Sequence, residues 1–208
     1  MKCLLFGNLD DSQYHPLGPV AEELKTLSPD IDFTVTTSPG DLVDPAKKGF
    51  DAVFNYADWL GRPFPDAAVD GLMDFVKTGH GLLTVHNGII INNRKYNDWM
   101  GAVFTDHPEY QELSFVPDAE NHPVTRGLNA FRQKDEMYRF AFTEKKKPEI
   151  LLECYFEGIQ YPAGWTTAHG QGRTAYLAPG HTAETFRHPV FRELLRRSLN
   201  WATGKNLS

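Results

Sequence analysis

The sequence predicts an α/β protein that forms one domain over residues 1–208 around a mainly parallel central sheet. In the first half of the chain, short apolar runs alternate with segments of helical periodicity. This alternation is typical of parallel strands joined by right-handed helical crossovers. The length suits a single domain, and neither a linker-like tract nor an internal repeat divides the chain.

Strands are expected where short apolar or alternating runs lie between turn residues. These runs are residues 3–6, 31–35, 51–54 and 82–85 in the first half, and 113–116, 150–152 and 174–177 in the second. Helices are expected where apolar residues recur every three or four positions, over 16–27, 65–77 and 189–203. Pro189 fits the first turn of the last helix, because its missing N–H would have no partner there.

The composition is that of an ordinary globular protein, with 41% hydrophobic and 23% charged residues. A net charge of −6 argues against general binding to nucleic acid or to anionic membranes, since both attract clustered basic residues. The densest basic run, residues 145–147, reads as a solvated turn. Cys3 and Cys154 lie in apolar runs, so we expect buried, reduced thiols.

No signal peptide and no apolar stretch of membrane-spanning length is evident in the sequence. We therefore expect a cytoplasmic protein, although an exported protein without its leader would look the same. Several common site motifs are also absent from the sequence: CxxC, HExxH, GxGxxG after the first strand, GxxxxGK[ST] and GxSxG. Nucleotide-cofactor, phosphate-loop and serine-hydrolase functions therefore lack support.

Candidate site residues follow the carboxyl ends of the expected strands, where open parallel sheets bind ligands. Four such ends carry polar residues, at 7–8, 55–56, 85–88 and 178–181. Aromatic residues could add a face on which a sugar ring stacks, and Tyr56, Trp59 and Trp165 are the candidates. The side chains expected to bind a substrate are Asn8, Asn55, Tyr56, Asn87, His107 and Trp165.

The clearest pattern is residues 81–88, where an apolar strand runs into His86 and Asn87 and then Gly88. A sharp strand-to-helix turn needs a small residue just past its apex, because the backbones there approach closely. The apex side chain then projects into the cleft. Since imidazole titrates near neutrality, His86 is a candidate general acid or base, or a metal ligand. The alternative is a buried histidine that is tied to a backbone carbonyl.

The run 174–177 also ends in a tight turn that is followed by a histidine, His181. If both strands are central and parallel, His86 and His181 open onto the same edge of the sheet, as a metal site or an acid/base pair requires. An exposed loop histidine is the alternative. The acidic pair Asp135-Glu136, which precedes another expected strand, could orient a histidine or bind a sugar hydroxyl. The candidate catalytic residues are His86, His181 and Glu136, and the candidate ligands of zinc or manganese are His86, His107 and His181.

Several stretches in order resemble the ThuA-like family, which is named for trehalose utilisation. They are GHGLLTVHNG (79–88), WMGAVFTDHP (99–108), HPVTRGL (122–128), DEMY (135–138), PGH (179–181) and the closing run 188–202, and together they cover nearly the whole chain. The family is similar in fold to class I glutamine amidotransferases, which implies a flavodoxin-like three-layer sandwich. By this resemblance His86 stands where those enzymes place the nucleophilic cysteine, and His181 where they place a histidine. We therefore do not expect a glutaminase.

The resemblance implies a role in carbohydrate metabolism, with trehalose-like disaccharides or their keto derivatives as small-molecule partners. Three hypotheses stay open: an enzyme that processes such sugars, a non-catalytic sugar-binding or regulatory module, and a metal-dependent hydrolase of another substrate. In the first, His86 or Glu136 would remove a proton next to a ketone, while His181 or a divalent metal polarises the oxygen. No nucleic-acid or membrane partner is expected, and a homo-oligomer stays open.

Overall fold

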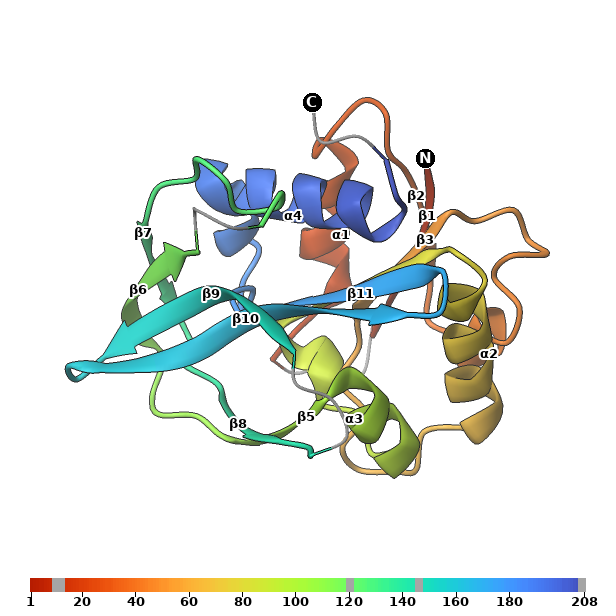
Figure 1. The fold of residues 1–208 in the computed structure, drawn as a ribbon, viewed down its shortest axis with the longest axis horizontal. Coiled ribbons are helices and arrows are strands. Elements are labelled where there is room, and N and C mark those ends of the chain that lie inside the picture. The colour runs from red at the N-terminus through yellow and green to blue at the C-terminus, as the bar shows by residue number, and fades with distance from the viewer. Residues whose placement is uncertain (9–13, 119–121, 145–147, 206–208) are drawn as a thin grey trace.

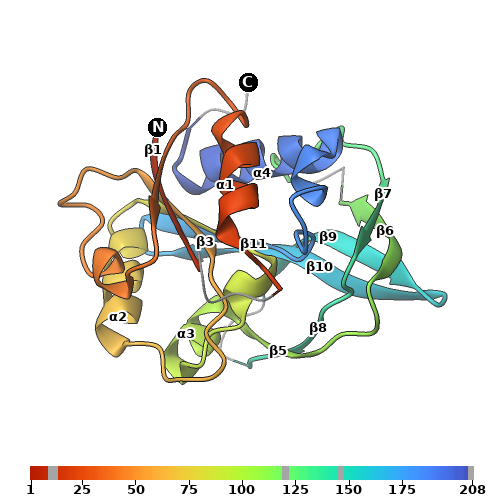
Figure 2. The ribbon, with the colours of Figure 1, turned by 180° about the vertical axis from the view of Figure 1, so that it is seen from behind.

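The computed structural model describes residues 1–8, 14–118, 122–144 and 148–205, so the basic run at 145–147 lies outside the described residues. Its main sheet has nine strands in the order β2-β1-β3-β4-β11-β10-β9-β6-β7, and β5 pairs with β8 in a separate sheet (Figures 1 and 2). The strands are β1 (Lys2–Gly7), β2 (Asp32–Thr36), β3 (Ala52–Tyr56), β4 (Gly81–Val85), β5 (Ala102–Asp106), β6 (Gln111–Pro117), β7 (Phe131–Asp135), β8 (Arg139–Phe142), β9 (Glu149–Phe156), β10 (Ile159–His169) and β11 (Gly172–Leu177).

The main sheet is parallel at one end and antiparallel at the other. The strands β2, β1, β3, β4 and β11 run parallel to one another. Each of β10, β9, β6 and β7 is antiparallel to its neighbours. The expectation of a mainly parallel sheet is therefore right for one end only, and the sheet as a whole is mixed. The antiparallel strands all come from the less regular second half of the chain.

Helices cover the parallel end of the sheet on both faces. The helices α1 (Leu17–Lys25) and α4 (Pro189–Ala202) lie on one side, while α2 (Asp66–Lys77) and α3 (Arg94–Met100) lie on the other (Figures 1 and 2). Both α2 and α4 contact β4 and β11, so these strands are covered from two sides. All five residues of β4 are accordingly buried, which explains its continuous apolar run. Three short 3-10 helices, η1 (Pro39–Leu42), η2 (His86–Ile89) and η3 (Thr185–Arg187), complete the elements.

The expected helices and strands are confirmed to within a few residues at each end. The strand expected after the acidic pair is β8. In contrast, α3, β5, β7 and β10 have no counterpart among the expected elements. In β10 the pattern is broken by Pro162 and Gly164, where the pairing with β9 also shifts register. Proline and glycine within a run are ordinarily evidence against a strand, which explains why β10 is missed.

Both cysteines are buried and free, as the sequence predicts. Burial raises the pKa of the Cys154 thiol to about 12. None of the helices in the described part of the chain has the length and apolarity that a bilayer crossing requires.

Candidate metal centre

The turn after β4 places His86 at the apex of a strained elbow. His86 has a φ of 48°, a left-handed conformation that residues other than glycine rarely adopt. Two residues on, a Cβ at Gly88 would come within 2.4 Å of the carbonyl oxygen of Asn55. The glycine expected past the apex is therefore required by the close approach of β3. The His86 side chain itself is fully buried.

The turn after β11 brings His181 to the same edge of the sheet, because β11 and β4 are parallel neighbours. Asp135, the fully buried last residue of β7, holds this turn in place. Its carboxylate accepts hydrogen bonds from the backbone N–H groups of Gly180 (2.9 Å) and His181 (3.3 Å) and from the hydroxyl of Thr185 (2.9 Å). The acidic residue predicted to orient a histidine thus does so through the backbone of the histidine turn.

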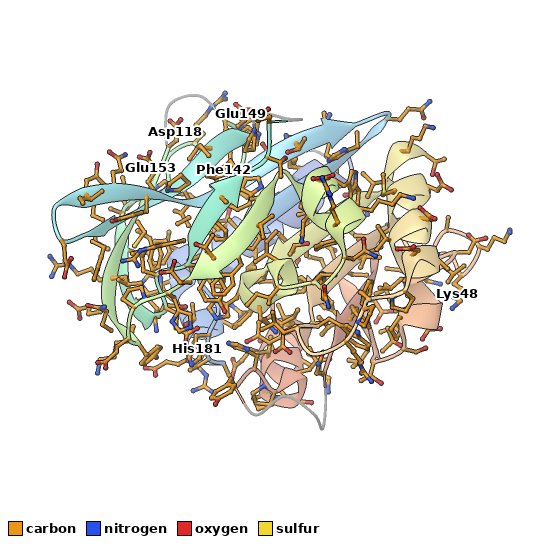
Figure 3. The ribbon with its side chains drawn as sticks, turned by 90° about the horizontal axis from the view of Figure 1, so that it is seen from below. Lys48, Asp118, Phe142, Glu149, Glu153 and His181 are labelled. Atoms are coloured by element: carbon orange, nitrogen blue, oxygen red, sulfur yellow. The ribbon has the colours of Figure 1, made fainter. Side chains whose placement is uncertain are left out.

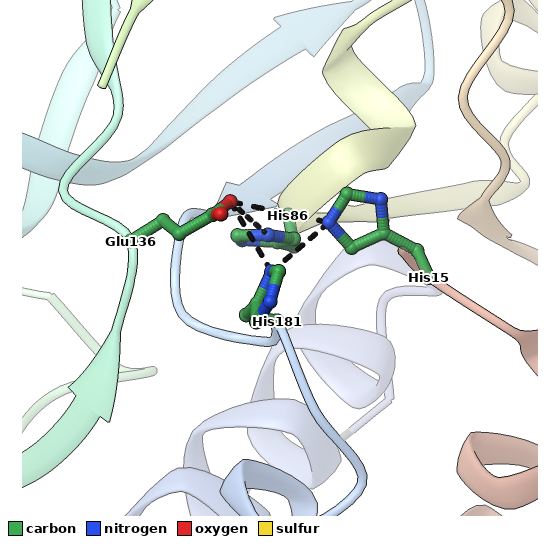
Figure 4. A group of neighbouring side chains, drawn as sticks. All are labelled: His15, His86, Glu136 and His181. Atoms are coloured by element: carbon green, nitrogen blue, oxygen red, sulfur yellow. Dashed lines mark hydrogen bonds and ion pairs between the residues drawn. The ribbon is translucent and has the colours of Figure 1, made fainter. Parts of the chain in front are cut away.

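Four side chains, His15, His86, Glu136 and His181, meet where these turns converge (Figure 4). One ligand atom from each lies within 4.8 Å of the other three. The oxygen Oε2 of Glu136 is 3.2 Å from His181 Nδ1, 3.4 Å from His86 Nε2 and 4.0 Å from His15 Nε2. The nitrogens His15 Nε2 and His181 Nδ1 are 3.1 Å apart. This group is called the His₃Glu cluster below.

In His86 and His15, the ring nitrogen that points away from the cluster, Nδ1, lies near an oxygen acceptor. His86 Nδ1 lies 2.7 Å from the carbonyl oxygen of Ala178. A carbonyl only accepts, so Nδ1 carries a proton, and in the neutral ring the lone pair of Nε2 faces the cluster. His15 Nδ1 lies 3.3 Å from Asp58 Oδ2, and the same argument leaves the lone pair on His15 Nε2. Bonds of this kind from the far nitrogen are the usual supports of metal-binding histidines.

The surroundings of Glu136 in the His₃Glu cluster favour its ionised form. Burial opposes ionisation of Glu136, but interactions with the rings of His181 and His86 outweigh it and hold the pKa of Glu136 well below its usual range. For His181, burial lowers the pKa, yet Glu136 more than compensates and the pKa is raised. Burial, the largest effect, lowers the pKa of His15, and the hydrogen bond to Asp58 opposes it.

His107 lies beside the His₃Glu cluster but is not one of its four members. Its Nδ1 is 2.8 Å from the carbonyl oxygen of Pro108 and 3.8 Å from Glu136 Oε1, the carboxylate oxygen that faces away from the cluster. The side chain is 36% exposed, so it sits at the rim. Because Nδ1 donates to a carbonyl, Nε2 carries the lone pair in the neutral ring of His107. Of the histidines expected as candidate metal ligands, His86 and His181 thus belong to the cluster and His107 does not, while His15 joins it.

No pattern in the sequence indicates His15 or its partner Asp58. His15 follows β1 and Asp58 follows β3, so both lie beyond the carboxyl ends of parallel strands. That position is the one signal that could have identified them. The dipeptide His15-Pro16 is also one of several His-Pro pairs in the chain. Because such pairs are expected at turns and helix caps, the dipeptide does not distinguish His15 as a site residue.

Four of the six expected substrate-binding side chains are buried. Each is at most 2% exposed and bonds to the backbone of a neighbouring segment: Asn55, Tyr56, Asn87 and Trp165. These residues support the walls of the site and the core. Asn8 differs, because it lines a cavity of about 350 Å³ together with Asp58.

A separate acidic group, Asp118, Glu149 and Glu153, is not part of the site. Figure 3 shows these three residues on the opposite side of the view from His181.

The His₃Glu cluster brings together the three candidate catalytic residues His86, His181 and Glu136, and it adds His15.

Comparison with known proteins gives a family and a fold. The family model described as ThuA, trehalose utilisation, matches residues 7–202. A ThuA-like protein from Parabacteroides merdae has a TM-score of 0.78 at 20% identity, covering 99% of this chain and 91% of that chain. One from Bacteroides uniformis has a TM-score of 0.74 at 19% identity, covering 100% and 94%.

A β-galactosidase from Rahnella sp. R3 also matches, with a TM-score of 0.67 at 15% identity. The match covers 98% of this chain but 31% of that enzyme, so the shared part is one portion of a larger protein. At these identities the solved structures show a common fold. None of the curated proteins matches the chain significantly.

Proposed function

Because the chain belongs to the ThuA family, we propose that it is a metal-dependent enzyme that acts on trehalose-like disaccharides or their keto derivatives. The family description, trehalose utilisation, supports the substrate class. The observation that carries the proposal is the convergence of three imidazoles and one carboxylate in the His₃Glu cluster.

The donor set suits a divalent cation such as zinc or manganese, both of which accept imidazole nitrogen and carboxylate oxygen. With both rings neutral and no cation between them, the lone pairs of His15 Nε2 and His86 Nε2 would face the carboxylate of Glu136 and repel it. His86 Nε2 is buried without a hydrogen-bond partner among the described residues, and a cation would satisfy it. A module that only binds sugar would need no such set, which favours the enzyme hypothesis.

The residues divide into a cation-holding group and a proton-transfer group. A bound cation would polarise the carbonyl oxygen of a keto sugar. His15, His86, Glu136 and His181 would hold it. A carboxylate whose pKa is well below its usual range is a weak base, so Glu136 is poorly suited to remove a proton. We assign that task to His107 at the rim. In the neutral ring, its Nε2 would take the proton from the carbon next to the carbonyl, and the electron pair would pass to the carbonyl oxygen.

The same proposal excludes a glutaminase-type reaction through a thiolate. The elbow carries His86, and the two cysteines of the chain, Cys3 and Cys154, are both buried outside the cluster. Histidine cannot replace a thiolate as the nucleophile in this layout. We also propose that the parallel end of the sheet, which helices cover on both faces, corresponds to the three-layer flavodoxin-like sandwich of the amidotransferases.

Elemental analysis of the purified protein tests the cation site. Wild type should hold roughly one equivalent of zinc or manganese, and His15→Ala, His86→Ala and His181→Ala should each lose it. His80→Ala is the matched control, because His80 precedes β4 whereas His86 follows it, at the opposite end of the same strand. Equal metal content in all four variants and wild type would contradict the proposed site.

A second measurement separates cation binding from chemistry. With keto derivatives of trehalose as substrates, turnover should require the cation and stop on chelation. His107→Ala should keep the metal but lower kcat by roughly 10²–10⁴-fold, as loss of a general base does. Full turnover by His107→Ala would remove it from the mechanism, and turnover by the chelated enzyme would remove the cation.

A further inference from the structure

A cavity of about 350 Å³ lies next to the His₃Glu cluster, and the proposed mechanism makes no use of it. Its walls are formed by residues that follow β1 and β3: Asn8, Asp58, Trp59, Leu60, Gly61 and Arg62. Asp58 belongs to both places, because its Oδ2 is 3.3 Å from the Nδ1 of the cluster residue His15. A ligand in the cavity would therefore lie beside the cation.

Two polar atoms without partners are buried within residues that line the cavity. The side-chain oxygen Oδ1 of Asn8 and the indole Nε1 of Trp59 are buried and have no hydrogen-bond partner among the described residues. One is an acceptor and the other a donor. Buried polar atoms are ordinarily paired, so these two are exceptions, and a ligand in the cavity would reach them only if the side chains of the wall moved.

The charged groups on the walls have the same complementary character. The guanidinium of Arg62 lies over the indole of Trp59, 4.0 Å from the ring centroid, and presents several N–H donors. The carboxylate of Asp58 is an acceptor on the same wall. The ligand must then both donate and accept at several closely spaced positions, which is the chemistry of a ring of hydroxyl groups.

We propose that this cavity binds the sugar ring that does not react, while the reacting ring lies at the His₃Glu cluster. The inference rests on the proposed function, because it takes the cluster as the place of reaction. Ligand pockets span roughly 300–1,000 Å³, so a cavity at the lower end suits one ring rather than two. The enzyme thus selects disaccharides through a subsite formed by Asn8, Trp59 and Arg62, with Asp58 placed between the two rings.

Isothermal titration calorimetry with trehalose and with glucose tests the subsite. Arg62→Met keeps the length of an exposed side chain but removes its donors, and Asn8→Ala removes the unpaired acceptor. Each should weaken trehalose binding at least tenfold, since loss of a hydrogen bond to a sugar in such a site has effects of that order. Val103→Ala is the control, because Val103 lines a different, more apolar cavity, and it should bind trehalose as wild type does.

Metal content is measured on the same preparations, so that the two proposals fail separately. The subsite is supported if both variants lose sugar affinity while their metal content stays that of wild type. Unchanged trehalose affinity in both variants, or a wild type that binds glucose as tightly as trehalose or binds neither sugar, overturns it. A wild type without metal whose sugar binding still depends on Arg62 would reject the cation site and leave the subsite standing.

Discussion

Replacing Asp135 by asparagine should destabilise the protein and displace His181. The carboxylate is fully buried, and its Oδ2 accepts from the backbone N–H of Gly180 and from the hydroxyl of Thr185, both at 2.9 Å. Its Oδ1 accepts from the N–H of Glu136 at 2.9 Å. An amide of the same shape has only one acceptor, so at least one of these donors must face an NH₂ group.

The cost follows from the best orientation that the amide can adopt. With its oxygen at the Oδ1 position, the amide keeps the bond from Glu136, and the Thr185 hydroxyl can rotate to accept from the NH₂ group. The N–H of Gly180 has no such option. Losing a bond to a charged group costs ~1.5–3 kcal/mol, and leaving a buried donor unpaired costs ~1–3 kcal/mol. We expect a loss of about 3 kcal/mol in the free energy of unfolding.

Urea denaturation followed by circular dichroism measures this loss directly. For a chain of this length, about 3 kcal/mol should also lower the Tm by roughly 6–12 °C. Asp106→Asn is the control, because it breaks an exposed pair with Arg139 and should leave the midpoint nearly unchanged. A loss of less than about 1 kcal/mol in Asp135→Asn would show that the carboxylate does not hold the His181 turn, and the reasoning would fail.

Three further predictions follow from the packing and charges described. Gly88→Ala should cost about 1–3 kcal/mol and weaken metal binding, because its Cβ would sit 2.4 Å from the Asn55 carbonyl oxygen; wild-type stability and metal affinity would contradict this. The hydrogen bond from Arg196, with further help from the next residue, lowers the pKa of Glu193 to about 2. Its stabilising effect should therefore be complete above pH 4.5 and disappear as the pH falls towards 2, so urea curves of wild type and Glu193→Gln should differ by about 0.5 kcal/mol at pH 7 and converge in acid. Cys154, whose pKa burial raises to about 12, should not react with a thiol reagent until the protein unfolds, and labelling at the rate of a free thiol would refute this.

The parallel end of the fold could be predicted from the sequence because its signals are local. A strand buried on both faces, such as β4, is a continuous apolar run between turns, and that run also marks the position of His86. β10 carries no such signal. Its pairing tolerates Pro162 and Gly164 only because the ladder with β9 shifts register there, which is a property of two strands together.

In the site, too, some residues could be predicted from local sequence signals and others could not. His86 and His181 each follow a predicted strand, so their convergence could be expected on the condition that both strands are central and parallel, and β11 does pair in parallel with β4. His15 could not, because what makes it a member of the cluster is the distance from His15 Nε2 to His181 Nδ1, and nothing near it in the sequence encodes that distance. The burial of Trp165 and Tyr56 likewise depends on how the antiparallel strands and helices close around them.

Because Glu136 follows a strand at the edge of the sheet, binding of the proposed cation would be coupled to local opening of that strand. Glu136 comes directly after β7, an outermost strand of the nine, which is paired on one side only. Such strands are the first to open in local unfolding. His15, in contrast, leads into α1 at the parallel end. A cation held by both would join the two ends of the mixed sheet, so fraying of β7 and release of the ion would be one event.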